Sequence, residues 1–414
     1  MIIGIDAHNL EGKRTGVGRY LFNLLKEWDN ISICHSERSE ESIANASRHK
    51  VGDPSGCALR MTKGIKFILY FKDGIPENLP PRLCSGQAPF ECELLKTKST
   101  AKFIHWDLPR AAKKDKIDIL FCPGYVAPVF YGGKIALTLH DISYEAHPEW
   151  FNWSSLADRI LLKWISEKSA KKAAVIFTPS EFSRQEVIKY YGAPVEKIIA
   201  TPLAVDSSLF EKFHSPAHQT KEIKVIKEKY GLKDEFVFYI GSIFSRRHLP
   251  EIIAAFKHLT KEMPEYQLLA VGKDYTSNRS VDKIIEKINQ ELGRPAILRI
   301  DYPSDSELKL LYSACAFFIW LSDYEGFGLP VLEAMSCGAP VITTDGSSLN
   351  EVAGQAALLI KNNYDIKEIY RAMKRLAEDE ILRQELVKKG KEQASKFSWK
   401  ECAEKTLEKL LIFN

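Results

Sequence analysis

Several features that would narrow the function of a protein are absent from this chain of 414 residues. Its eight cysteines stand singly, without a C-x-x-C pair, so neither a zinc ligand set nor a disulfide framework is supported, and we expect reduced thiols. No window approaches eighteen consecutive apolar residues, which argues against a membrane-spanning helix. The start lacks the basic region and long apolar core of a signal peptide, so we expect a cytoplasmic protein.

An excess of charge of one sign is also absent. The chain has 58 Lys and Arg against 54 Asp and Glu, and the net charge of +4 is too small to indicate nucleic acid as a partner. The mild basic excess is compatible with peripheral contact with an anionic membrane on its inner face. No complete G-x-G-x-x-G motif occurs, which disfavours a dinucleotide dehydrogenase. No D-x-D pair stands at a strand end, so we expect no metal and no other cofactor.

What the sequence does contain is a regular alternation of strand-like apolar runs and helix-length amphipathic segments, typical of α/β domains built on parallel sheets. A polar stretch without periodicity divides this pattern into two series. We predict an N-terminal domain at 1–205, a linker at 206–222, a C-terminal domain at 223–397 and a last helix at 398–414. Residues 34–63 are polar with almost no aliphatic periodicity and are predicted as a disordered insertion.

Eleven strands are predicted from short apolar runs in the two halves of the chain. The predicted strands are Ile2–Ile5, Lys66–Phe71, Ile117–Cys122, Ile135–Leu139, Ala174–Pro179, Lys197–Pro202, Phe236–Ile240, Gln267–Val271, Ile297–Ile300, Ala316–Leu321 and Val341–Thr344.

The richest motif follows the apolar run that ends at Leu321. Gly326 and Gly328 allow a tight turn and a close approach of the backbone to a ligand, and Pro330 suits the first turn of a helix that begins near Leu329. The amide groups at the start of a helix favour an anion such as a phosphate. The motif therefore predicts a strand, a ligand-binding turn and a helix in sequence.

Two carboxylates flank this turn. Glu325 lies in the loop and Glu333 on the first turn of the predicted helix. A carboxylate only accepts hydrogen bonds, so such a pair suits the hydroxyl groups of a sugar and of a ribose. An ordinary solvated pair of acids is the alternative. The glycines and the preceding buried strand favour the cradle of a polyhydroxylated, anionic ligand.

This stretch resembles the E-x7-E signature of retaining glycosyltransferases of family 4, which have the GT-B architecture. The likeness extends to 304–315 and 347–354 and covers nearly the whole chain apart from one segment near the N-terminus. The resemblance implies two Rossmann-like domains facing each other across a cleft, with the N-terminal domain on the acceptor side. It also implies a last helix that crosses back to the N-terminal domain. The implied reaction is metal-independent transfer from a nucleotide diphosphate sugar.

Two further segments, at Leu137–Asp141 and around Gly16 and Gly18, resemble the family. Leu137–Asp141 ends a predicted strand, and the resemblance implies that His140 lies near the donor sugar, while Asp141 could orient its ring. Gly16 and Gly18 resemble the glycine-rich loop near the donor diphosphate, predicted to precede a helix at Tyr20–Trp28. Each of these motifs, taken alone, is also compatible with a structural role.

The candidate phosphate-binding segment begins at Gly241, which closes a predicted strand. Arg246 and Arg247 follow, and guanidinium groups bind phosphate oxygens more strongly than a helix dipole does. The family usually has Arg-Lys-Asn here, so Arg247 replaces a lysine and His248 an asparagine. Which arginine makes the main phosphate contact stays open at this point.

The sequence thus predicts a retaining glycosyltransferase that transfers a hexose to a glycan or a lipid-linked acceptor in the synthesis of cell-surface polysaccharide. Resemblance to mannosyltransferases makes GDP-mannose the first donor, with UDP-glucose, UDP-galactose and rhamnose donors open. The alternatives are a GT-B nucleotide-sugar epimerase and a catalytically silent sugar-nucleotide-binding protein. The predicted catalytic residues are His140, Asp141 and Glu325, and the predicted donor-binding residues are Gly16, Gly18, Gly241, Arg246, Arg247, Gly326, Phe327, Gly328, Leu329 and Glu333.

One helix suggests a second partner. The segment Ser154–Lys172 carries apolar residues on one side and lysines elsewhere, a pattern compatible with docking on anionic lipid. A helix that buries its apolar side in the core and exposes a basic face fits the same pattern and is the preferred interpretation.

Overall fold

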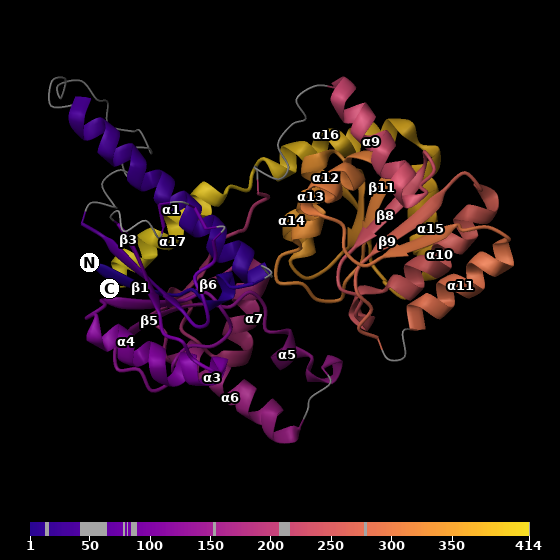
Figure 1. Cartoon of the computed structure of the whole chain (residues 1–414). Helices are drawn as coiled ribbons and strands as arrows, with labels where there is room; N and C mark the ends of the chain where they lie inside the picture. The colour runs from indigo at the N-terminus through magenta and orange to yellow at the C-terminus, as the bar shows by residue number, and fades with distance from the viewer. Residues whose placement is uncertain are drawn as a thin grey trace. The chain divides into compact units, whose positions relative to one another are not determined.

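The structure is a computed structural model, and it describes residues 1–12, 16–41, 64–77, 79–80, 82–83, 89–151, 155–206, 216–276 and 280–413. The chain forms two compact units (Figure 1): the first comprises Met1–Leu203 and Ser398–Asn414, and the second comprises Ala204–Phe397. Each unit contains one fully parallel sheet, which confirms the predicted α/β class.

The first unit is built on a sheet of seven strands in the order β3-β2-β1-β4-β5-β6-β7. Its strands are β1 Ile2–Asp6, β2 Lys66–Phe71, β3 Phe90–Leu94, β4 Ile119–Cys122, β5 Lys134–Thr138, β6 Val175–Thr178 and β7 Ile198–Ala200. Its helices are α1 Gly16–Glu41, α3 Thr100–Lys102, α4 Leu108–Lys114, α5 Ser143–Ala146, α6 Leu156–Lys172, α7 Glu181–Tyr191 and α17 Trp399–Ile412, with a short 3-10 turn η1 at His8–Leu10 and a π-helical turn at Phe103–Asp107.

Alternate residues of these strands bury opposite faces of the first sheet, as period-two side-chain geometry requires. On one face Trp28 of α1 stacks on Phe67, with ring centroids 5.3 Å apart, and Phe67 stacks on Phe90 at 4.8 Å. The indole Nε1 of Trp28 donates to the carbonyl of Ala403 in α17 at 2.9 Å. The last helix, α17, therefore packs on α1 within the first unit, and Figure 1 shows the two helices side by side.

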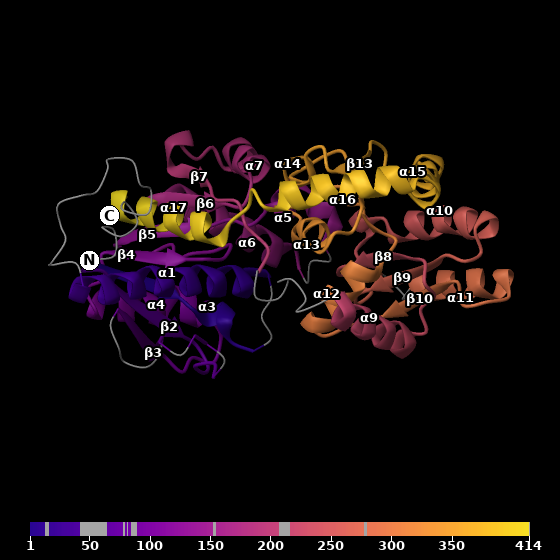
Figure 2. The same ribbon diagram turned by 90° about the horizontal axis from the view of Figure 1, so that it is seen from above.

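The second unit has six strands in the order β10-β9-β8-β11-β12-β13. The strands are β8 Phe236–Ile240, β9 Gln267–Val271, β10 Ile297–Ile300, β11 Phe317–Trp320, β12 Val341–Thr344 and β13 Ala357–Ile360. The helices are α9 Pro216–Tyr230, α10 Leu249–Glu262, α11 Ser280–Leu292, α12 Asp305–Ala314, α13 Leu329–Cys337, α14 Leu349–Ala353, α15 Ile366–Glu378 and α16 Glu380–Ala394, and η6 is a 3-10 turn at Ser245–Arg247. In Figure 2 this sheet lies between helices on both faces.

The order of strands places one topological switch point in each sheet. The connections reverse direction between β1 and β4 in the first sheet and between β8 and β11 in the second. In open parallel sheets, ligands bind outside the carboxyl ends of the strands at such a point, because the loops there diverge and leave space. The loops after these four strands are therefore the places to look for a site.

Two predictions about chain organisation need correction. Helix α1 continues to Glu41, so the first eight residues of the predicted insertion are helical; this stretch contains no proline or glycine and is rich in Glu. The remainder, 42–63, lies outside the described residues. The predicted linker ends early, because α9 begins at Pro216, a residue suited to a helix start, and 207–215 lie outside the described residues.

Two strands were missed, and one cysteine differs from expectation. Strands β3 and β13 both lie at sheet edges, where a strand has a single neighbour and needs no continuous apolar run. Cys122, Cys315, Cys337 and Cys402 are thiols, but Cys92 is disulfide-bonded, contrary to the expected reduced state.

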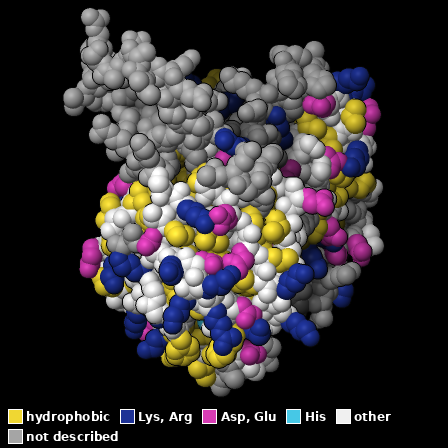
Figure 3. Space-filling model, turned by 60° about the vertical axis from the view of Figure 1, so that its left-hand side comes forward, with side chains coloured by type: hydrophobic (Ala, Val, Ile, Leu, Met, Phe, Trp, Pro, Cys, Tyr) yellow, Lys and Arg dark blue, Asp and Glu magenta, His cyan; other side chains and the backbone are white. Residues whose placement is uncertain are grey.

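The surface carries charges of both signs, as the nearly equal numbers of basic and acidic residues predict. On the face shown in Figure 3, basic and acidic side chains are interspersed with apolar ones. Among the described residues, no helix combines the length and the apolar character that crossing a membrane requires.

Candidate functional site

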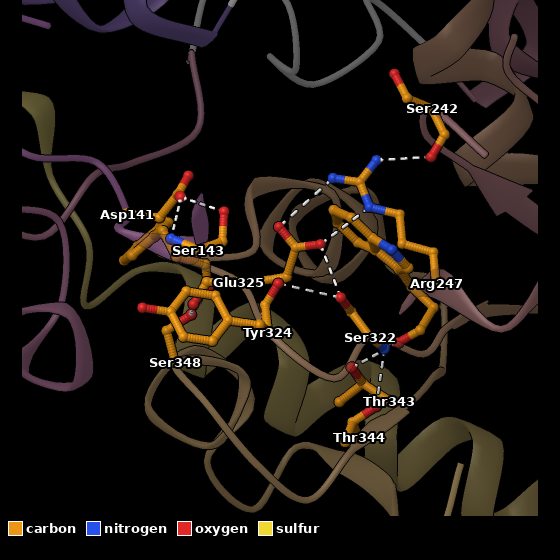
Figure 4. Close-up of polar contacts among 12 residues, drawn as sticks. Asp141, Ser143, Ser242, Arg247, Ser322, Tyr324, Glu325, Thr343, Thr344 and Ser348 are labelled. Atoms are coloured by element: carbon orange, nitrogen blue, oxygen red, sulfur yellow. Dashed lines mark hydrogen bonds and ion pairs between the residues drawn. The ribbon is translucent and has the colours of Figure 1, made fainter. Parts of the chain in front are cut away.

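An ion pair between Arg247 and Glu325 is the centre of the site in the second unit (Figure 4). Arg247 Nε lies 3.0 Å from Glu325 Oε1, and Nη2 lies 3.5 Å from Oε2, so the guanidinium and the carboxylate meet edge to edge. Both side chains are largely buried, at 14% and 13% exposed. The pair joins the loop after β8 to the loop after β11, the two strands that flank the switch point.

Further contacts hold the Arg247 guanidinium in place. Its Nη1 donates to the Ser242 carbonyl at 3.0 Å, and the group lies 5.2 Å from the centre of the Trp320 ring. Gly241, the predicted glycine after β8, has φ +146°, and a Cβ added there would stand 3.0 Å from Arg247 Nη1. Both guanidinium groups lie over the ring of Phe244, Arg246 at 4.7 Å and Arg247 at 5.8 Å. The two predicted arginines therefore share an aromatic neighbour.

Two serines that the sequence analysis did not single out shape the Glu325 loop. Ser322 Oγ donates to Glu325 Oε1 at 3.0 Å. Ser348, which is fully buried, donates to the carbonyls of Glu325 and Phe327 at 2.8 and 2.9 Å, so one hydroxyl spans the predicted turn. Gly328 has φ +104°, and a Cβ there would meet Leu349 Cδ2 at 2.6 Å, which only glycine avoids.

Helix α13 begins at Leu329, as predicted, with Pro330 in its first turn. Gly326, Phe327 and Gly328 precede it, and Phe327 packs edge-on against Phe397 with centroids 5.6 Å apart. The helix start therefore lies beside Glu325, where its amide groups are available to an anion. This places the predicted donor-binding backbone next to the ion pair, at one end of the second sheet.

Glu333 lies deeper than the sequence analysis predicted. It is the fifth residue of α13, beyond the first turn, and is 6% exposed. Tyr312 of α12 donates its hydroxyl to Glu333 Oε2 at 3.0 Å. The carboxylate therefore has a structural contact in addition to any role toward a ligand, and the two roles need a test that separates them.

We expect Glu333→Ala to weaken binding of a nucleotide sugar about tenfold to a hundredfold, because it removes a charged hydrogen-bond acceptor. Tyr312→Phe is the matched control, since it removes the internal hydrogen bond and keeps the carboxylate. Isothermal titration with GDP-mannose measures both variants. Equal affinity of Glu333→Ala and the native protein, with reduced stability, would assign Glu333 to packing alone.

His248 links the two loops a second time. It has φ +50°, is fully buried, and its Nε2 lies 2.7 Å from Asp323 Oδ1. Glu251 Oε2 lies 3.7 Å from its Nδ1, and the ring of Tyr364 meets it edge-on at 4.6 Å. Asp323 also accepts from Asn363 at 3.0 Å. Burial by itself lowers the pKa of His248, but the two carboxylates outweigh it and raise the pKa to about 9.

A pH dependence follows from this pair. The imidazolium contributes stability in full below its unfolded pKa of about 6.5, and the contribution is lost as the pH rises through about 9. We expect the free energy of unfolding to fall by at most about 3 kcal/mol across this window for this reason. Urea titrations at pH 6 and pH 9.5 measure it. His248→Asn, which tolerates positive φ but does not titrate, should show a smaller fall; an equal fall would contradict the prediction.

In the first unit, His140 follows β5, and its ring is packed against Tyr20 of α1, edge-on at 4.8 Å. Its Nε2 lies 2.9 Å from the Pro123 carbonyl, which can only accept, so Nε2 carries the proton and Nδ1 has the lone pair. Burial lowers the pKa of His140. The ring is therefore a neutral acceptor at neutral pH.

Asp141 does not orient the His140 ring, contrary to the prediction. Its Oδ1 accepts from the backbone N–H and the hydroxyl of Ser143, at 2.9 and 2.7 Å, and Tyr125 donates to its Oδ2 at 3.1 Å. An Asp side chain readily accepts from the backbone N–H two residues further on, which explains the difference. Asp141 thus holds the start of α5, and the Pro123 carbonyl orients His140.

Gly16 and Gly18 also differ from the predicted loop. Both lie within the first turn of α1, which begins at Gly16 rather than near Tyr20. Gly18 is buried and Gly16 is exposed. Tyr20, one turn further, contacts His140, so this helix start lies beside the histidine at the carboxyl edge of the first sheet.

The described side chains thus form two groups. Gly241, Arg247, Glu325 and the 326–329 backbone lie together in the second unit, with Glu333 on the adjoining helix. His140, Asp141, Gly16 and Gly18 lie in the first unit. Among the described residues, no group of His, Cys, Asp and Glu side chains could hold a metal ion.

Comparison with known proteins identifies the family. The family model described as Glycosyl transferases group 1 matches residues 221–393, and that described as Glycosyltransferase Family 4 matches residues 81–209. The chain is 33% identical over 272 residues to O-antigen chain mannosyltransferase B of Escherichia coli, covering 65% of this chain and 68% of that protein. The chain belongs to glycosyltransferase family 4. It is therefore a glycosyltransferase.

Other relatives of this glycosyltransferase match it in part. It is 30% identical over 240 residues to the serotype-specific mannosyltransferase WbdA of Escherichia coli, covering 58% of this chain but 29% of WbdA. It thus spans less than a third of that protein's length.

Solved structures of similar fold cover the whole glycosyltransferase chain. Sucrose-phosphate synthase from Thermosynechococcus elongatus has a TM-score of 0.69 at 17% identity, covering 99% of this chain and 98% of that one. WaaG, a glycosyltransferase involved in lipopolysaccharide biosynthesis, has a TM-score of 0.68 at 15% identity, covering 98% of each chain. With the two parallel sheets, these likenesses confirm the GT-B fold.

Proposed function

We propose that this glycosyltransferase transfers a hexose with retention of configuration from a nucleotide diphosphate sugar to a hydroxyl of a glycan or lipid-linked acceptor, in the synthesis of cell-surface polysaccharide. Mannose from GDP-mannose is the proposed donor, because the relatives with 30% identity or more are mannosyltransferases. The observation that carries the proposal is the Arg247–Glu325 pair beside the start of α13, where a guanidinium, a carboxylate and helix amides converge.

In this proposal each charged group meets the part of the donor that it complements. The Arg247 guanidinium and the amides at the start of α13 stabilise the diphosphate as negative charge develops on it, without a metal. Arg247 is better placed for this than Arg246, since it lies directly beside Glu325. Glu325 accepts from the sugar hydroxyls and Glu333 from the ribose hydroxyls.

The transfer itself exchanges one bond at C1 of the sugar. The bond from C1 to the β-phosphate oxygen breaks, and its electron pair stays on the phosphate. The acceptor oxygen bonds to C1 on the same face, and its proton passes to the departing phosphate. His140, a neutral acceptor at Nδ1, is able to accept a hydrogen bond from a sugar hydroxyl.

The test is a panel of nucleotide sugars with and without lipid extract, in which released nucleotide and labelled sugar product are both measured. Nucleotide release with transfer of labelled mannose to the extract supports the proposal. A free epimer of the sugar would indicate an epimerase instead. Tight binding of GDP-mannose without release would indicate a silent binding protein.

We also propose peripheral contact of α6 with an anionic membrane. The preferred interpretation of its apolar side as core is not supported, because Ile160, Leu161 and Trp164 are 59%, 54% and 42% exposed. Lysines 168, 171 and 172 follow on the same helix, and a basic helix with exposed apolar residues suits anionic lipid.

Sedimentation with vesicles measures this contact. We expect the protein to bind vesicles that contain phosphatidylglycerol better than neutral ones, and Trp164→Gln to bind several-fold less. Exposed Ile381, at the start of α16 in the second unit, gives the control variant Ile381→Gln. Equal loss in both variants, or equal binding to neutral vesicles, would contradict the proposal.

A further inference from the structure

A cavity of about 620 Å³ opens at the carboxyl ends of β1 and β2 in the first unit, apart from every residue discussed above. Its lining includes His8, Glu11, Lys72, Asp73 and Ile75. It adjoins β1, one of the two strands at the switch point of this sheet. Its size is that of a small-molecule site, and its position is where parallel sheets bind ligands.

His8 in the lining is held by a buried acid, Asp6, behind it. Asp6, the last residue of β1, is 2% exposed, and its Oδ1 accepts from the His8 backbone N–H at 3.3 Å and from His8 Nδ1 at 2.5 Å. Because Nδ1 is used in this way, the Nε2 edge is the part of the ring available to a ligand. Burial lowers the pKa of His8, but the nearby Asp6 carboxylate outweighs it, so the net shift is upward.

The wall of the cavity is fixed by Glu11. Its Oε1 accepts from the backbone N–H groups of Lys72 and Asp73, at 2.5 and 3.0 Å, which ties the loop after β2 to the turn after β1. Lys72 Nζ in turn lies 2.8 Å from Asp73 Oδ2. Two segments distant in sequence are therefore held in one arrangement by hydrogen bonds within the protein.

The charges of the lining select the ligand. Glu11 and Asp73 are negative and Lys72 is paired with Asp73, while His8 is backed by the Asp6 carboxylate, so the cavity has no surplus of positive charge for a phosphate. It offers donors and acceptors in close alternation beside the half-exposed side chain of Ile75. Hydroxyl groups both donate and accept, and a sugar ring has an apolar face, so a neutral sugar is the complementary ligand.

Continuous contacts connect the cavity to His140. The Pro123 carbonyl accepts from His140, and the next residue, Gly124, closely approaches Asn9, which adjoins His8: a Cβ added to Gly124 would lie 3.6 Å from Asn9 Nδ2. Strands β2, β1, β4 and β5 are successive neighbours in the sheet, so the two places lie two to three strand spacings, or roughly 10–15 Å, apart along one edge.

We propose that this cavity binds a sugar unit of the acceptor glycan and thereby positions the chain whose hydroxyl is glycosylated. The inference rests on the proposed function for the nature of the acceptor. It adds the residues of the acceptor side: His8, Lys72 and Asp73 hydrogen-bond the sugar, Ile75 packs on its ring, and Glu11 positions the loop.

Kinetics of the double variant Lys72→Met/Asp73→Asn test the proposal, with GDP-mannose as donor and α-mannobiose and octyl α-mannoside as free and lipid-like acceptors. We expect KM for both acceptors to rise about tenfold, with the GDP-mannose affinity and the rate of donor hydrolysis in the absence of acceptor unchanged. The control is Lys66→Met/Glu91→Gln, which removes an exposed ion pair of the same length, 2.8 Å, from the same sheet. Unchanged acceptor KM, or an equal rise in the control, overturns the proposal.

A second measurement keeps the result independent of catalysis. Ligand-observed NMR with α-mannobiose and the native protein, without donor, should show binding that the double variant loses and that inorganic phosphate does not displace. Displacement by phosphate at the same concentration would overturn the assignment to a neutral sugar. If the native enzyme transfers no sugar from any donor, the proposed function fails, while the NMR result still decides whether the cavity binds a sugar.

Discussion

Replacing Arg247 by Met is expected to lower kcat about a hundredfold to a thousandfold, the usual cost of removing one preorganised group that stabilises charge in a transition state. Arg247 is the guanidinium that meets Glu325 and the Ser242 carbonyl at the switch point of the second sheet. Radiolabelled sugar transfer at saturating donor measures kcat. Arg246→Met is the matched control, and we expect a smaller effect because we propose Arg247, which pairs with Glu325, as the main phosphate contact. A larger loss in the Arg246 variant would reverse the assignment.

Loss of folding must be separated from loss of chemistry in this experiment. The Glu325 carboxylate, which is 13% exposed in the native protein, loses its cation when Arg247 is replaced. Breaking a buried ion pair in this way destabilises a protein by about 3–5 kcal/mol. The double variant Arg247→Met/Glu325→Gln removes both charges and should recover much of the stability measured in urea. It should not recover activity. Recovery of both would mean that Arg247 acts only through folding.

Gly272→Ala is expected to destabilise the second unit by about 3 kcal/mol or more. Gly272 follows β9 with φ +143°, and a Cβ there would lie 1.9 Å from the Gly241 carbonyl oxygen, at the end of neighbouring β8. No rotation relieves a clash between two backbones, so the loop that leads to Arg247 must move. Urea unfolding measures the loss of stability, and kcat measures the effect of moving the loop that leads to Arg247.

The control for Gly272 is Gly231→Ala. Gly231 also has positive φ, +66°, but an added Cβ would have nothing within 4 Å. It therefore isolates the backbone cost of about 1 kcal/mol from the clash. If the two variants unfold at the same urea concentration, the close approach of β8 and β9 does not constrain the fold.

Much of the architecture is readable in the sequence because buried parallel strands leave continuous apolar runs. All eleven of these runs became strands within two residues of the predicted bounds at each end, from Ile2 to Thr344. The edge strands β3 and β13 were not predicted because a strand with a single neighbour needs no continuous apolar run. Helix α1 is longer than predicted because its polar helix-forming residues give no periodic hydrophobic pattern.

Only part of the candidate site could be predicted from the sequence. Local motifs contain Glu325, Glu333 and Arg247, which were therefore predicted. The serines Ser322 and Ser348 were missed because serines are common. The His248–Asp323 pair was missed because its partners lie 75 residues apart in the sequence, and those of the Arg247 pair lie 78 apart. The sequence also predicted a wrong partner for His140, because adjacency in the chain suggested Asp141 while the fold supplies the Pro123 carbonyl.

The sequence by itself determined the fold class, the family and the identity of the charged residues, because these depend on local periodicity and on motifs of a few residues. Tertiary structure alone decided that Arg247 pairs with Glu325, that His248 is held between two carboxylates, and that His8, Lys72 and Asp73 share a cavity. Each of these depends on which strands are neighbours in a sheet, and strand order follows from how the whole chain packs.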